Sequence, residues 1–131
     1  MAWPVEPKAI AEALGLRFHS TTGNWSTYRL DVQGAPTWHA VTFEHVPAYV
    51  EVFSRLRGVA RPIAGVKVGP VREVRNGQGD ASLVLVTDHG TLTLERVGDS
   101  LAFYVKDVVE EHVVAEMKRE EEAMEEADLG V

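Results

Sequence analysis

The stretch Ala81–Val105 reads ASLVLVTDHGTLTLERVGDSLAFYV, and it is the part of the sequence that decides the fold. Aliphatic and β-branched residues fill three runs, and short turns rich in Asp and Gly separate them. Runs of this length between such turns are typical of antiparallel strands, and Gly-Asp is a two-residue hairpin signal. We therefore predict three strands, over 81–87, 91–97 and 101–105.

The sequence before this stretch predicts further strands. Val66–Arg75 completes a four-strand meander, with Pro70 as a bulge or an edge residue. Trp25–Val32 and Trp38–Glu44 are rich in aromatic and β-branched residues, and the loop between them contains Gly and Pro. This pattern predicts an N-terminal hairpin.

The register of this hairpin decides which side chains face the core. A five-residue loop places Leu30 opposite Ala40 on an apolar face, and Asp31 opposite His39 on the other face. Because side chains alternate along a strand, a slip of one residue would exchange the two faces.

Two short helices are also predicted. Lys8–Leu14 follows a proline and precedes Gly15, and these residue types are common at the start and the end of a helix. The second helix begins at Pro47 and ends at Gly58. Its apolar residues recur at helical spacing: Val46, Val50, Phe53 and Leu56.

A long acidic helix is predicted from Asp107 to about Ala127, because Asp107 and Glu110 form a capping-box pattern. It carries a narrow apolar stripe, which we predict to contact a partner or a second copy of the chain: Val109, Val113, Met117 and Met124.

Together these elements predict an α+β fold. An antiparallel sheet, made of the N-terminal hairpin plus the four-strand meander, is combined with two short helices and the long acidic C-terminal helix. A further short strand is expected at Leu16–Ser20. We expect residues 1–131 to form a single domain, with an acidic tail over about 107–131.

The composition excludes several classes of protein. The chain has 131 residues, 45% apolar and 25% charged, which suits one ordinary globular domain. With no cysteine it has no disulfide framework, thiol nucleophile or iron–sulfur site. It has neither an apolar run long enough for a membrane span nor an export-signal pattern, so we expect a cytoplasmic protein without membrane contact. Asn and Gln together number only four, which favours a heat-adapted or GC-rich bacterial source.

The net charge of −7 is unevenly distributed along the chain. Residues 107–131 hold ten acidic and two basic side chains, a net of −8, whereas residues 1–106 have a net of +1. Within 55–75, six basic side chains face one acidic one, a net of +5. Such asymmetry can mark an interaction tail. The candidate contacts to an anion or a nucleic acid are Arg55, Arg57, Arg61, Arg72 and Arg75.

No pattern of catalytic, metal-binding or cofactor-binding residues stands out. The five histidines lack the spacing of a metal-ligand set. The Gly-Gln-Gly stretch at 77–79 has no following Lys and precedes a strand, unlike a phosphate-binding loop. No serine lies in a Gly-x-Ser-x-Gly elbow. We therefore predict no cofactor and no catalytic or metal site.

Three functional hypotheses follow. The first is a non-catalytic bacterial protein-interaction domain, with a protein partner or a second copy in a homodimer. The second is a single-stranded nucleic-acid binder, because Trp25, Tyr28, Trp38 and Phe43 lie on adjacent predicted strands beside Arg29. In it, the acidic tail screens the basic segment 55–75. The third is a small-molecule binder or an enzyme of undetermined reaction, with a pocket near His39 and Asp31.

Overall fold

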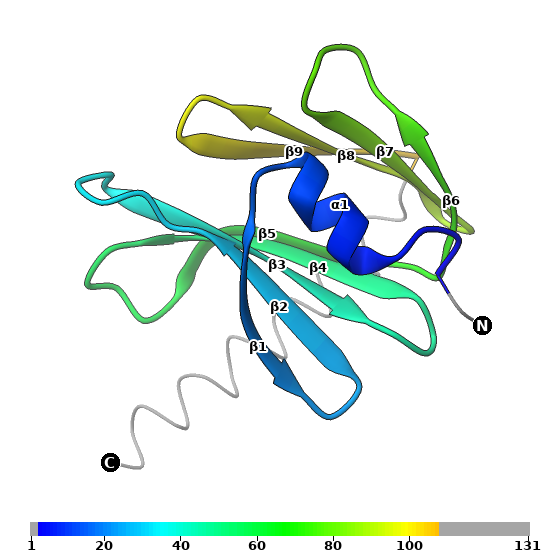
Figure 1. Ribbon diagram of the computed structural model, residues 1–131, viewed down its shortest axis with the longest axis horizontal. Helices are drawn as coiled ribbons and strands as arrows, with labels where there is room; N and C mark the ends of the chain where they lie inside the picture. Colours follow the sequence, from blue (N-terminus) through cyan, green and yellow to red (C-terminus); the bar gives the residue numbers. More distant parts are fainter. Residues whose placement is uncertain (1–2, 108–131) are drawn as a thin grey trace.

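The structure is a computed structural model, and it describes residues 3–107 (Figure 1). Within these residues the chain forms one helix and nine strands. They are α1 (Pro7–Ala13), β1 (Arg17–Thr22), β2 (Trp25–Leu30), β3 (Thr37–Glu44), β4 (Tyr49–Leu56), β5 (Pro62–Val68), β6 (Val71–Asn76), β7 (Ser82–Thr87), β8 (Gly90–Val97) and β9 (Ser100–Lys106).

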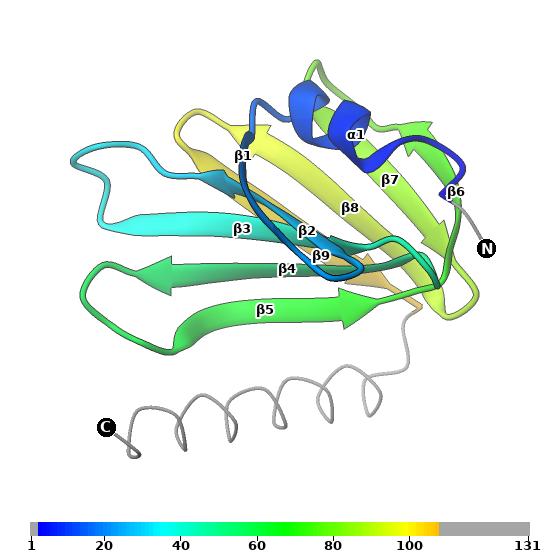
Figure 2. The same ribbon diagram turned by 60° about the horizontal axis from the view of Figure 1, so that its bottom comes forward.

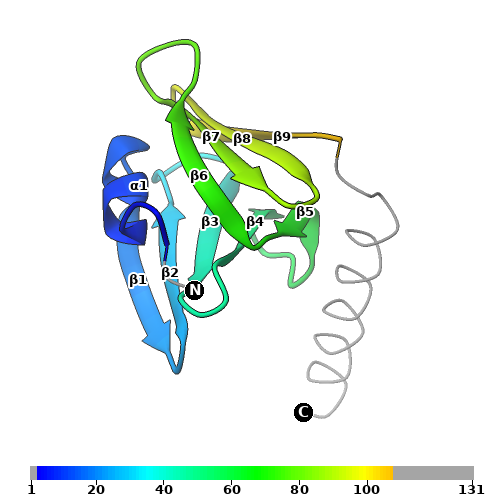
Figure 3. The same ribbon diagram turned by 90° about the vertical axis from the view of Figure 1, so that its right-hand side faces the viewer.

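The strands form two antiparallel sheets, and within each sheet a strand pairs with its neighbours in sequence. The first sheet has the order β1-β2-β3-β4-β5, and the second has the order β6-β7-β8-β9. The second sheet lies against one face of the first, as the end-on view shows (Figure 3). α1 lies at one open side of this sandwich, between the edges of the two sheets (Figures 1 and 2).

The core lies between the sheets and is almost entirely aliphatic. The largest fully buried side chains of the first sheet are Val41, Phe43, Val50, Val52 and Val68, and those of the second are Val71, Leu85, Leu92 and Leu94. α1 adds Ile10 and Leu14, which are four residues apart and therefore share one helix face. Each such side chain stabilises the fold by about 1.5–3 kcal/mol through burial.

The predicted α+β fold class is wrong, because the described residues form a two-sheet structure with a single short helix. The predicted helix between Pro47 and Gly58 is strand β4. Val50, Val52 and Ser54 alternate inward along it, and both of its edges are paired, with β3 and with β5. The apolar residues at helical spacing, on which the predicted helix rested, therefore lie in a strand whose burial alternates and which is paired on both sides.

The strand predicted over 66–75 is two strands, β5 and β6, which belong to different sheets. The chain passes from one sheet to the other at Gly69 and Pro70. Since proline cannot donate to a strand ladder, it lies at this crossing rather than within a strand.

The predicted hairpin exists as β2 and β3, but its register differs by one residue. Leu30 lies opposite His39 rather than Ala40. His39 therefore faces the core, and Ala40 lies on the outer face with Arg29. The shift exchanges the two faces of β3 relative to the predicted arrangement.

The other predicted strands and the first helix agree with β1, β7, β8, β9 and α1 to within a few residues at their ends. The predicted long acidic helix lies outside the described residues. No helix in the described part of the chain is long and apolar enough to cross a membrane.

Gly69 is the position at which the crossing between sheets depends on a missing side chain. Its φ is +153°, and a Cβ atom there would lie 2.8 Å from Tyr49 Cα and 3.0 Å from the carbonyl oxygen of Ala48. Gly79 also has a positive φ, +101°, but a Cβ there would meet nothing within 4 Å.

We expect Gly69→Ala to lower the free energy of unfolding by about 2–5 kcal/mol, since backbone strain and steric overlap with a neighbouring strand add together. Gly79→Ala is the matched control, and it should lose only about 1 kcal/mol, because it adds strain without overlap. Urea unfolding followed by circular dichroism measures both. Equal losses would contradict the steric role of Gly69.

Candidate interaction surface

The outer face of the five-stranded sheet carries a group of aromatic and cationic side chains. No element within residues 3–107 lies across this face, because the second sheet packs on the opposite side (Figure 3). We call the group the aromatic–cationic face: Trp25 and Arg29 of β2, Trp38 of β3, Phe53 and Arg55 of β4, and Lys67 of β5.

Strand alternation and pairing place these residues together. Trp38 lies opposite Arg55, and Ala40 lies between Arg29 on one side and Phe53 on the other. The small side chain of Ala40 is fully buried. Arg29 and Phe53, its partners on the neighbouring strands, flank it on this face.

The contacts within the face centre on Trp38. The Arg29 guanidinium carbon lies 3.9 Å from the centre of the Trp38 ring, and that of Arg55 lies 5.7 Å from it. Phe53 meets Trp38 edge to face, with ring centres 5.9 Å apart. Cations at these distances are attracted to the ring by about 0.5–2 kcal/mol each. These contacts link Arg29, Phe53 and Arg55 to Trp38.

Lys67 extends this arrangement across the sheet. Its Nζ lies 4.9 Å from the centre of the Trp25 ring, although β3 and β4 separate the two strands. This contact places both residues on the outer side and links β5 to β2.

Asp31, just beyond β2, joins the face to the neighbouring loops. Arg29 Nη2 donates to Asp31 Oδ2 at 3.0 Å, and Arg57 Nη2 donates to Asp31 Oδ1. The predicted neighbour of Asp31, His39, is on the inner side instead. The predicted Asp31–His39 pair is therefore wrong, for the same reason as the register.

The five predicted anion contacts do not form one patch. Arg55 belongs to the aromatic–cationic face. Arg57 and Arg61 lie in the loop between β4 and β5, where Arg57 also donates to two carbonyl oxygens of the β2–β3 loop, at 2.6 and 2.9 Å.

Arg72 and Arg75 lie on β6 of the other sheet, and each pairs with a carboxylate. Arg72 binds Asp88 with two hydrogen bonds, of 3.0 and 2.7 Å, and Arg75 binds Glu73 with two, of 2.8 and 2.9 Å. These hydrogen bonds lower the pKa of both carboxyl groups below their ordinary values. Exposed ion pairs of this kind typically contribute little to the free energy of unfolding.

The aromatic residues singled out from the sequence are divided between the two faces of the sheet. Trp25 and Trp38 are on the outer face, whereas Tyr28 and Phe43 pack edge to face on the inner side, with ring centres 5.7 Å apart. Burial, and to a lesser degree the charge of Glu12, raises the pKa of Tyr28. Phe53 was not recognised because its strand was predicted as a helix. The predicted contact stripe of Val109, Val113, Met117 and Met124 lies outside the described residues.

Two histidine–serine pairs lie on the inner side of the same sheet. His39 Nδ1 and Ser54 Oγ are 2.7 Å apart, and so are His45 Nε2 and Ser26 Oγ. A serine beside a histidine can act as a nucleophile when an acidic group orients the ring and substrate can reach the hydroxyl. His39 is only 7% exposed and Ser54 6%, and His39 Nε2 has no hydrogen-bond partner in the described part of the chain. Both side chains of this pair are therefore buried on the inner side of the sheet.

No cluster of three or more potential metal-ligating side chains occurs within residues 3–107. Comparison with known proteins identifies no related family: no family model matches the chain, and no curated protein or solved structure is significantly similar to it. The function must therefore be argued from the surface itself.

The buried His39 makes stability depend on pH. Burial lowers the pKa of His39 below its ordinary value of 6.5, because the charged ring is poorly solvated between the sheets. In the unfolded chain the ring takes up a proton near pH 6.5, whereas in the native protein it does so only at lower pH. The unfolded state therefore binds more protons between these two values, and native stability decreases as the pH falls through this range.

We expect the free energy of unfolding of the wild-type protein to decrease more between pH 7.5 and pH 5.5 than that of His39→Gln, whose side chain cannot titrate. Urea unfolding of both proteins at the two pH values measures this difference. Equal decreases would show that His39 is not the responsible group.

Proposed function

We propose that this protein is a non-catalytic protein-interaction domain whose binding surface is the aromatic–cationic face. The cluster of Arg29, Arg55 and Phe53 around Trp38 is the observation that supports it. Tryptophan and arginine are the residue types most enriched at the energetic centres of protein interfaces. A surface already ordered by internal contacts loses little conformational entropy on binding.

The chemistry of the face defines the kind of partner. Guanidinium groups pair with carboxylates through two parallel hydrogen bonds, so a partner that carries carboxylates is favoured. The rings of the face and the aliphatic stems of its arginines offer apolar area. A segment that presents carboxylates beside apolar side chains combines both features. The sequence also predicts that the chain forms a homodimer, and a second copy of the chain is the alternative partner.

We expect Trp38→Ala to weaken partner binding about thirtyfold, since truncation at the centre of such an interface costs about 2 kcal/mol. The control is Tyr104→Ala, which removes a ring that is 56% exposed on the other sheet. Tagged wild-type and variant proteins are used to capture partners from a lysate of the source organism, with and without nuclease, and captured proteins are quantified by mass spectrometry.

Proteins retained by the wild type and by Tyr104→Ala, but lost with Trp38→Ala, would support the proposal if nuclease does not remove them. Circular dichroism confirms that each variant is folded. Identical capture by the three proteins would contradict the assignment of this face.

A second candidate is single-stranded nucleic acid, and the guanidinium of Arg29 over the ring of Trp38 favours it. Bases stack on planar guanidinium groups and on aromatic rings, and flanking cations attract the phosphates. The net charge of −7 opposes this binding, and the acidic residues that cause it are concentrated in 107–131.

On this second hypothesis, deletion of residues 118–131 should raise the affinity for single-stranded DNA or RNA roughly tenfold at low salt, since it removes a net charge of −4. Added salt should then weaken the binding steeply. Fluorescence anisotropy with labelled oligonucleotides measures both effects. If the shortened protein does not bind either nucleic acid at low salt, this candidate is excluded.

A further inference from the structure

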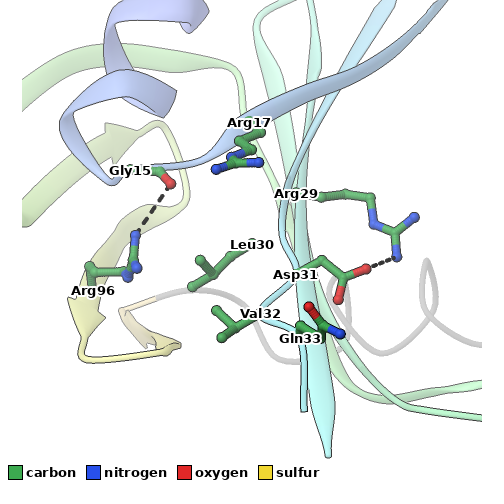
Figure 4. A pocket seen from close by; sticks show the side chains of 8 residues that line it. All are labelled: Gly15, Arg17, Arg29, Leu30, Asp31, Val32, Gln33 and Arg96. Carbon is green, nitrogen blue, oxygen red and sulfur yellow. Dashed lines mark hydrogen bonds and ion pairs between the residues drawn. The ribbon is translucent and has the colours of Figure 1, made fainter. Parts of the chain in front are cut away.

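A pocket of about 390 Å³ opens at one end of the sandwich, and Arg29 of the aromatic–cationic face lies at its border. It lies where the end of β2, the link from α1 to β1 and strand β8 meet (Figure 4). Its lining contains three arginines and one carboxylate: Gly15, Arg17, Arg29, Leu30, Asp31, Val32, Gln33 and Arg96.

Two of these arginines are placed directly opposite each other. Arg17 of β1 pairs with Arg29 of β2 in the strand register. Their guanidinium groups point in different directions, since that of Arg29 turns toward Asp31 (Figure 4). Arg29 is compensated by Asp31 and by the ring of Trp38, whereas Arg17 has no ion-pair partner within residues 3–107. Arg17 is exposed and lines the pocket, so its guanidinium is accessible to a ligand there.

The third arginine is held in place by the backbone. Arg96 donates from Nε to the carbonyl oxygen of Gly98 at 2.6 Å, and from Nη1 to those of Leu14 and Gly15 at 3.1 and 3.2 Å. Gly15 is required for this approach, since a Cβ atom there would lie within 2.3 Å of Arg96 Nη1. The guanidinium is therefore fixed at the pocket before any ligand arrives.

The floor of the pocket is apolar. Leu30 and Val32 lie between Arg96 on one side and Asp31 and Gln33 on the other (Figure 4). Asp31 is already bound by two arginines, Arg29 and Arg57, so its charge repels an incoming anion only weakly. The guanidinium of Arg17 points toward the space between Arg96 and Arg29.

We propose that this pocket binds a small organic oxyanion, whose charged group lies between Arg17 and Arg96 and whose apolar part lies on Leu30 and Val32. Guanidinium groups pair with carboxylate and phosphate oxygens through two parallel hydrogen bonds. The volume suits a ligand of ordinary metabolite size. Arg29 borders both this pocket and the aromatic–cationic face, but the two proposed anion contacts, Arg17 and Arg96, do not belong to that face.

The test measures thermal unfolding and isothermal titration with four probes: inorganic phosphate, hexyl phosphate, hexanoate and, as a cationic control, hexylamine. We expect hexyl phosphate or hexanoate to raise Tm by several degrees at millimolar concentration, inorganic phosphate to raise it less, and hexylamine to have no effect. The comparison of hexyl phosphate with hexanoate distinguishes a phosphate site from a carboxylate site.

Arg17→Gln should weaken binding of the preferred probe at least tenfold, whereas Arg17→Lys should weaken it less. Arg75→Gln, which removes an arginine from the other sheet, is the matched control and should bind like the wild type.

Two results would overturn the proposal. One is the absence of any shift with all three anions in the wild-type protein. The other is an equal shift in the wild type and in Arg17→Gln, which would place the anion elsewhere. Neither result depends on partner capture, so the site and the proposed interaction domain can fail separately.

Discussion

The apolar contact between the two sheets is the constraint on which the rest of the structure depends. Valines of β3 and β4 on one side and leucines of β7 and β8 on the other are fully buried, and α1 closes an open side with two more aliphatic residues. Because one face of the five-stranded sheet must pack inward, strand alternation directs every second side chain to the other face. The aromatic–cationic face exists for this reason.

The same constraint explains why the two proposed sites differ in kind. The outer face is broad and its groups order one another, so it suits a macromolecular partner whose surface can cover several strands. The pocket lies where the sandwich ends and three separate segments meet around an apolar floor. A small ligand can be enclosed there, because side chains approach it from several directions.

Much of the secondary structure could be predicted from the sequence, but the fold class could not. The three apolar runs in 81–105 can be interpreted only as strands, since turns that contain Asp and Gly separate them. The apolar residues between Pro47 and Gly58 fit both a helix and a strand. Val50 and Phe53 are three residues apart, as on one face of a helix, whereas Val50 and Val52 are two apart, as on one face of a strand. Only pairing on both edges decides between them, and that depends on residues distant in sequence. The hairpin register failed for a related reason, because loop length alone does not fix which residues are opposite each other.

The candidate sites were less predictable than the strands. Trp25, Trp38 and Arg29 were recognised as a group, and the structure keeps them on one face. Tyr28 and Phe43 were grouped with them, but alternation in the correct register turns both inward. The basic segment 55–75 is continuous in sequence yet divided between two sheets, because the chain crosses at Gly69. Arg17 and Arg96 are far apart in sequence, and no local pattern connects them.

The single crossing at Gly69 has a consequence for the newly made chain. All five strands of the first sheet precede it, and all four strands of the second follow it. The ribosome therefore releases one complete layer several seconds before its cover, at ordinary rates of synthesis. During that interval the valine-rich side of the first layer is open to water and to other nascent chains. The core between the sheets can therefore be completed only after β6 to β9 have been made.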